Sequence, residues 1–128
     1  MVIYSEQNKE DFLTIISRYQ ENAIGFWEEH RKLVYLLIIA GFVDFVSTVY
    51  FMQNYGIDKE VHPLIRYLAY ECGPITGTLI GKFAQISMGT LAIVYIRQHA
   101  KLILSIAAVM YSWAAVTNFI SFLPGLFV

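Results

Sequence analysis

Long apolar stretches alternate with charged segments along the chain. The apolar stretches cover residues 33–51, 74–96 and 102–123, and the only charged residues within them are Asp44 and Lys82. Each stretch has about 20 residues, the length of helix that crosses the hydrocarbon core of a bilayer. Because backbone amides in lipid must be paired within their own segment, each stretch is predicted to be a helix. The pattern therefore predicts an all-α integral membrane protein with three transmembrane helices.

The first 32 residues have a different pattern. Between residues 8 and 30, apolar side chains recur at helical spacing opposite a charged face. We expect an amphipathic helix in 1–32 that either lies on the membrane surface or docks onto a partner, ahead of a three-helix transmembrane domain in 33–128. The polar face is acidic and anionic lipid would repel it, so we favour contact with a protein. The apolar positions are Phe12, Ile15, Ile16, Tyr19, Ala23, Phe26 and Trp27; the acidic ones are Glu6, Glu10, Asp11, Glu21, Glu28 and Glu29.

The segment between the first two apolar stretches predicts a short surface helix. Turn-rich residues 53–58 are followed by His62-Pro63, so the helix is expected to begin at Pro63 or Leu64. Gly73 ends it, and Pro74 suits the first position of the next helix. The apolar face of this short helix consists of Ile65, Leu68, Ala69 and Cys72.

Basic residues near the ends of the spans predict the orientation. Cytoplasmic loops carry the excess of Lys and Arg, so the more basic side is taken as the cytoplasm. The amino terminus is then cytoplasmic, and the segment 52–73 and the carboxyl terminus lie outside. The more basic side has Arg31, Lys32, Arg97 and Lys101, and the other has Lys59 and Arg66.

Composition narrows the possible functions. Hydrophobic residues make up 57% of the chain and charged residues 15%, whereas ordinary soluble proteins have about 45–50% and about 25%. A soluble enzyme is therefore excluded, and the net charge of −1 without a basic run excludes a nucleic-acid binder. The single Cys72 cannot form an internal disulfide. No residue has the surroundings of a catalytic nucleophile, and no cofactor is expected.

Asp44 and Lys82 are predicted to form an intramembrane ion pair. An unpaired charge at the middle of a bilayer costs roughly 2.5–3.5 kcal/mol on insertion scales. Counting from the outer ends of their spans at about 1.5 Å per residue, Asp44 lies about 10 Å deep and Lys82 about 12 Å. Adjacent antiparallel helices would bring the two charges to one level.

Further polar side chains are expected to join this pair under the outer loop. Thr48 follows Asp44 by one turn, and Gln85 follows Lys82 by three residues, so each shares its neighbour's face. Asn118 of the third span lies at a similar depth, with Tyr111 two turns deeper on the same stripe. The expected cluster is closed by small residues, namely Gly41, Gly77, Gly81, Gly89, Ala108 and Ala115. The inner halves of the spans are apolar, so a polar path across one chain is not expected.

A metal site is an alternative use of the same region. Glu60 and His62 are two residues apart, and Asp44 would rise towards them from below. A carboxylate and an imidazole are common ligands of divalent metals. The competing interpretation is a solvated loop whose charges face water.

Several motifs follow one another along the chain in the order Asp44-xxx-Thr48, Gly56, Glu60-x-His62-Pro63-Leu64, Gly73-Pro74, Lys82, Arg97 and Tyr111. This order resembles an uncharacterised family of small three-span membrane proteins of bacteria and archaea. The family has an Asp-xxx-Thr span, a Glu-x-Asn-Pro loop and a Lys in the next span, so His62 stands where Asn is usual. The resemblance covers about residues 40–120 and implies a three-span architecture without implying an activity. The small size and the Ile- and Tyr-rich composition also resemble accessory subunits of archaeal membrane complexes such as ammonia monooxygenase.

The sequence favours a non-catalytic accessory subunit of a larger membrane assembly. Three helices around a small polar cluster leave much of their surface for larger subunits and for the lipid bilayer. One alternative is a small homo-oligomeric channel or carrier that uses Asp44 and Lys82. Another is a metal-binding membrane protein that uses Asp44, Glu60 and His62.

Overall fold

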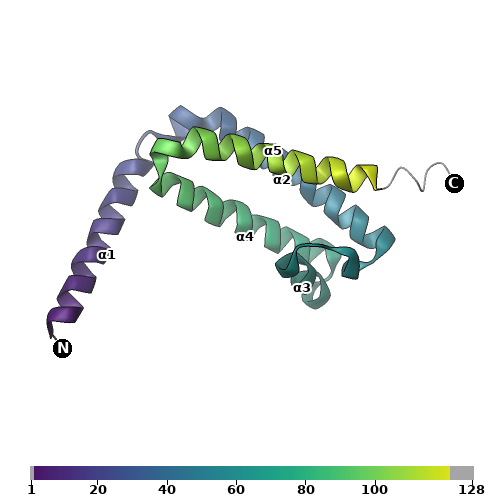
Figure 1. Ribbon diagram of the computed structural model, residues 1–128, viewed down its shortest axis with the longest axis horizontal. Helices are drawn as coiled ribbons and strands as arrows, with labels where there is room; N and C mark the ends of the chain where they lie inside the picture. Colours follow the sequence, from purple (N-terminus) through teal and green to yellow (C-terminus); the bar gives the residue numbers. More distant parts are fainter. Residues whose placement is uncertain (1, 122–128) are drawn as a thin grey trace.

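The computed structural model describes residues 2–121, and the secondary structure of this part of the chain consists of helices and short connections, without strands (Figure 1). Three of its helices, the second, fourth and fifth, are long and apolar enough to cross a membrane. They match the three predicted stretches, although residues 122 and 123 of the third lie outside the described part. The elements are α1 (Val2–Ala23), α2 (Phe26–Tyr55), the 3-10 turn η1 (Ile57–Lys59), α3 (Pro63–Cys72), α4 (Pro74–Tyr95), the 3-10 turn η2 (Arg97–His99) and α5 (Ala100–Ile120).

The three long helices pack unevenly. α2 and α5 lie side by side along most of their length, whereas α4 diverges from α5 towards the end where α3 lies (Figure 1). Ala100, Ala108 and Ala115 are buried on α5, and small residues of this kind let two helices approach closely. The opposite end of the bundle lies near α1. There an apolar core is shared by α2, α4 and α5 and includes Phe26, Val34, Leu37, Ile93, Val94 and Leu104.

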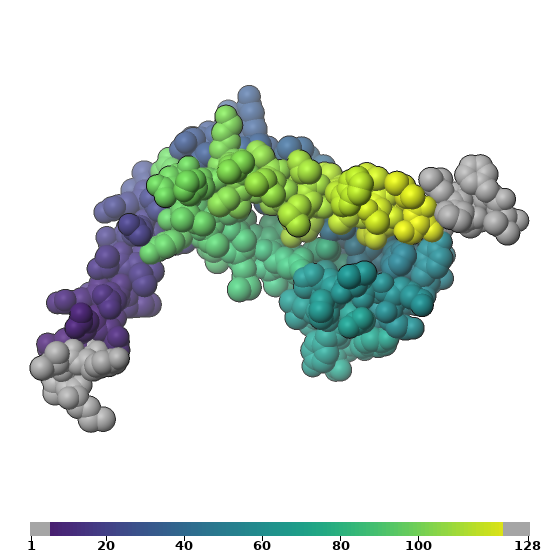
Figure 2. All heavy atoms as spheres, viewed as in Figure 1, coloured from purple at the N-terminus to yellow at the C-terminus, as the bar shows by residue number. Residues whose placement is uncertain are grey.

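α1 turns sharply away from the other helices. The chain changes direction at Gly25, whose φ of 73° lies in the left-handed region that favours glycine. Figure 2 shows α1 projecting from one end of the molecule, while the α3 segment bulges from the other. The single amphipathic helix expected over residues 8–30 is therefore divided, and residues 26–32 belong to α2.

α3 begins at Pro63, as predicted, and folds back along α4. A single residue, Gly73, joins the two antiparallel helices, with a φ of 88°. Ile65 and Ala69 are buried, whereas Cys72, expected on the same face, is exposed.

The glycines of α4 make a different contact from the one expected. A Cβ atom on Gly77 would lie 2.3 Å from the carbonyl oxygen of Leu68, and one on Gly81 would lie 3.1 Å from Ile65. Both glycines therefore allow α3 to pack closely on α4. Their predicted role in packing the long helices against one another is wrong. Gly41 does face another long helix, since its Cβ would lie 2.6 Å from Ile86 of α4.

The hairpin formed by α3 and α4 places the start of α3 beside the middle of α4. Ten helical residues span about 15 Å, and α3 covers that length in the direction opposite to α4. The connection over residues 56–62 must therefore run back from the end of α2 towards the middle of the bundle. Sequence reasoning had predicted only a short surface helix between the first two spans.

Candidate functional site

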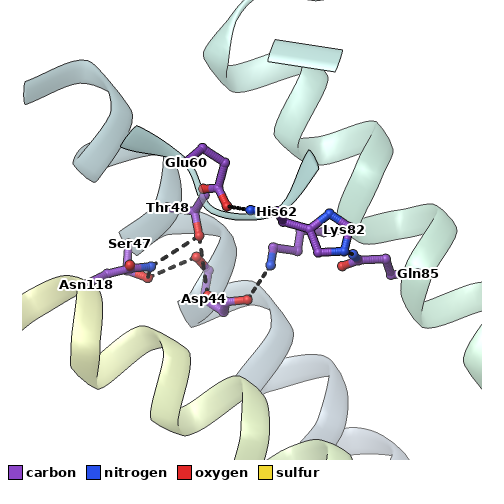
Figure 3. Close-up of polar contacts among 8 residues, drawn as sticks. All are labelled: Asp44, Ser47, Thr48, Glu60, His62, Lys82, Gln85 and Asn118. Carbon is purple, nitrogen blue, oxygen red and sulfur yellow. Dashed lines mark hydrogen bonds and ion pairs between the residues drawn. The ribbon is translucent and has the colours of Figure 1, made fainter. Parts of the chain in front are cut away.

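A buried ion pair joins α2 to α4 (Figure 3). Lys82 Nζ lies 2.5 Å from Asp44 Oδ2, so the contact expected from the depths of the two residues is present. The Asp44 side chain is 2% exposed and that of Lys82 is 13% exposed. A charge-assisted hydrogen bond of this kind is among the strongest in proteins, and each charge here has its partner.

Hydroxyl and amide groups extend the ion pair to α5. The Thr48 hydroxyl donates to Asp44 Oδ1 at 3.3 Å, and the Ser47 hydroxyl donates to the Asp44 carbonyl oxygen at 2.9 Å. Asn118 Nδ2 lies 3.1 Å from Ser47 Oγ and 3.3 Å from Thr48 Oγ1. Sequence reasoning missed Ser47, although its position three residues after Asp44 places it on the same helical face.

Gln85, predicted to be a member of the cluster, and Tyr111 both line a pocket together with Asp44 and Lys82. The Lys82 ammonium lies 5.5 Å from the centroid of the Tyr111 ring, within range of a cation–π contact. Gln85 Nε2 instead lies 2.8 Å from Nε2 of His62. This contact ties the connection before α3 to the middle of α4, and the separation of the two residues in sequence gave no signal of it.

A pocket of about 680 Å³ opens beside the ion pair, and we call it the loop pocket. Its walls come from α2, from residues 59–63 of the connection, from Lys82 and from α5. Asp44, His62 and Lys82 also line a second pocket of about 420 Å³ between α4 and α5. The loop pocket is lined by charged and aromatic side chains that include Asp44, Phe51, Lys59, Glu60, Lys82 and Trp113.

The three residues of the predicted metal site line the loop pocket without converging. Glu60 Oε1 accepts a hydrogen bond from the His62 backbone N–H at 2.8 Å, while Asp44 is bonded to Lys82. Within residues 2–121, no group of three His, Cys, Asp or Glu side chains is placed to hold a metal ion. The geometry therefore gives no support to the metal-binding alternative.

The α1 end has a separate polar network that sequence reasoning missed. Arg97 Nη1 donates to the carbonyl oxygens of Ile24 and Asn22, at 2.5 and 3.2 Å, and Nη2 lies 2.6 Å from Glu29 Oε2. Asn22 Nδ2 in turn donates to the Tyr95 carbonyl oxygen at 2.8 Å. These bonds, which we call the Arg97 clamp, fix the turn between α1 and α2 against the end of α4.

A hydrogen bond outside the long helices braces the connection to α3. The Tyr70 hydroxyl donates to Asp58 Oδ1 at 2.9 Å. This bond stabilises the carboxylate and lowers the pKa of Asp58, and it raises the pKa of the Tyr70 hydroxyl.

Comparison with known proteins identifies a family. A family model described as a domain of unknown function (DUF5658) matches residues 35–124, a range that includes the ion pair and the α3 hairpin. Searches of curated proteins and of solved structures gave no match. The predicted resemblance to an uncharacterised family is thus confirmed, whereas nothing supports the resemblance to ammonia monooxygenase subunits.

Proposed function

The chain belongs to the DUF5658 family, and we propose that this member is an integral membrane protein that acts as a non-catalytic subunit of a larger membrane assembly. The observation that carries the proposal is the apolar face of α1, which is fixed in direction at its base and exposed at Phe12, Ile15 and Ile16.

The long helices supply the argument for a membrane. Large apolar side chains on all three are exposed, including Ile39, Phe42, Phe83, Val109 and Trp113. A contiguous apolar surface of this extent is unfavourable in water and is typical of contact with lipid or with other subunits. The basic residues Arg31, Lys32 and Lys101 surround a pocket at the α1 end. We therefore propose that this end, with the amino terminus, is cytoplasmic, and that the α3 end faces outward.

The position of α1 argues for a partner. Tyr19 packs against the apolar core of the bundle, and its helical face continues as Phe12, Ile15 and Ile16, which are exposed. Phe12 alone is 61% exposed. The Arg97 clamp holds the base of α1, so this apolar face has a fixed direction. Acidic residues elsewhere on α1 would be repelled by anionic lipid, and a protein surface is therefore the better partner.

The chemistry of the ion pair argues for a non-catalytic role. Asp44 and Lys82 neutralise each other, and Asp44 is further bonded by Thr48. At the α1 end the space between the helices is filled by apolar side chains such as Leu37 and Leu104. A polar path therefore does not continue from the ion pair through the described helices, which disfavours transport through a single chain.

The proposal is tested by purifying the full-length protein from its native membrane in mild detergent. We expect larger subunits to co-purify in fixed stoichiometry and to be lost when Phe12 and Ile16 are changed to Gln. Val61→Gln is the matched control, because Val61 is 88% exposed on the connection before α3. Isolation of the native protein only as a free monomer, or equal co-purification in the α1 variant, would contradict the proposal.

A further inference from the structure

We propose that the loop pocket binds a small zwitterion, a molecule that carries an acid group and an ammonium without net charge. The subunit role proposed above does not require such a ligand. The inference uses that proposal only in placing the long helices in a membrane.

The backbone of the connection points to a water-filled site. Residues 60–62 are not helical, and the contact between His62 and Gln85 places them beside the middle of α4. Non-helical backbone at membrane depth is tolerated where it is buried in protein or lines a water-filled cavity. Here it forms a wall of the loop pocket, whose volume of about 680 Å³ falls within the roughly 300–1,000 Å³ of small-molecule sites.

The charges of the pocket select the class of ligand. Lys59 and Lys82 are balanced by Asp44 and Glu60, so the formal charges cancel when His62 is neutral. A ligand with net charge would leave an excess charge in a site where charge is costly to bury. A ligand that carries both signs meets a partner for each and leaves none over.

The groups that line the pocket suggest how the two ends of the ligand are held. Lys82 is the more exposed half of the ion pair, so the ligand's acid group would meet an ammonium at the floor of the pocket. Glu60 uses Oε1 for the His62 backbone N–H, and within the described part of the chain its second oxygen remains as an acceptor for the ligand's ammonium. The rings of Phe51 and Trp113 also line the pocket, and aromatic faces attract ammonium groups.

The experiment compares glycine, acetate and methylammonium at equal ionic strength. Each is titrated against the full-length protein in an uncharged detergent, and the thermal unfolding midpoint and saturation-transfer NMR are recorded. We expect a saturable response to glycine and much weaker responses to the two singly charged probes. Glu60→Gln should weaken the apparent affinity for glycine by about tenfold or more, the loss expected for one charged hydrogen bond.

Matched variants separate binding from general solute effects. Glu71→Gln changes an exposed carboxylate on α3 outside the pocket. This control should keep the response of the unaltered protein. A rise that is equal for the three probes, a rise that does not saturate, or a glycine response as strong in Glu60→Gln as in Glu71→Gln would overturn the proposal.

A second arm identifies the source of the zwitterion. A short-chain phosphatidylcholine, added below its micelle concentration, presents a phosphate and an ammonium on a lipid. A response to glycine indicates a free solute, and a response to the lipid alone indicates a headgroup; either supports the proposal, and the absence of a response to both overturns it. All these variants leave α1 intact, so failure here is distinguishable from failure of the subunit proposal.

Discussion

The two ends of the helix bundle are held together in different ways. At the α3 end, a buried ion pair and its hydroxyl and amide neighbours connect α2, α4 and α5. At the α1 end, an apolar core connects the same helices, and the ionic contact between Arg97 and Glu29 lies at the surface.

Burial decides how much each ion pair contributes to the stability of the fold. Removing one partner of a buried pair leaves the other charge without compensation, which typically costs about 3–5 kcal/mol. Exposed ion pairs contribute little to stability because water already solvates both charges. The pair at the α3 end therefore stabilises the fold, whereas the Arg97 clamp mainly sets the direction of α1.

The largest effect is expected when the buried pair is broken. Asp44→Ala should lower the free energy of unfolding by about 3–5 kcal/mol, because Lys82 is left charged and unpaired. The double variant Asp44→Ala with Lys82→Met should recover much of that loss. Unfolding in mixed micelles of increasing denaturing-detergent content measures both. If the double variant were as damaged as the single one, the pair would have a role beyond locking the helices.

The next effect concerns the packing of α3 on α4. Gly77→Ala places a methyl group 2.3 Å from the Leu68 carbonyl oxygen, and overpacking of this kind costs about 1–3 kcal/mol. Amide hydrogen exchange across α3 should accelerate as the helix is displaced. Gly89→Ala is the control, since its Cβ would meet no atom within 4 Å. Equal exchange rates in the two variants would refute the close contact described for Gly77.

The Arg97 clamp should affect geometry more than stability. Arg97→Gln removes the contact with Glu29 and weakens those with the Ile24 and Asn22 carbonyl oxygens. We expect a nearly unchanged unfolding midpoint, together with a broader distribution of distances between spin labels on α1 and α4 in a Cys72→Ser background. Arg31→Gln, at the same end, should leave that distribution narrow. A narrow distribution in Arg97→Gln would show that the clamp does not orient α1.

The smallest effect is the pH response of the connection before α3. The pKa of Asp58 is lowered by the Tyr70 hydroxyl, so this bond stabilises the folded state above the unfolded pKa of Asp58. The contribution is lost as the pH falls through the lower folded pKa. An NMR titration measures the pKa of the Asp58 carboxyl, which should rise in Tyr70→Phe and stay unchanged in Tyr67→Phe. An unshifted midpoint in Tyr70→Phe would exclude this hydrogen bond in solution.

Periodicity and depth determined much of the architecture from the sequence. The three apolar stretches became α2, α4 and α5 because a helix is the structure that pairs backbone amides without water. Asp44 and Lys82 form an ion pair because two buried charges at the same depth in neighbouring antiparallel helices have few other partners. Thr48, Asn118 and Tyr111 followed from helical spacing alone.

The tertiary structure decided the contacts that depend on the course of an irregular segment. Nothing in local sequence required residues 56–62 to run back along α4, so the contact between His62 and Gln85 and the loop pocket could not be anticipated. Gly77 and Gly81 indicated only that some backbone approaches closely, and the fold determined that the backbone is α3. The break at Gly25 is similar, because glycine permits a left-handed turn, while the clamp of Arg97, far away in sequence, sets the direction in which α1 leaves.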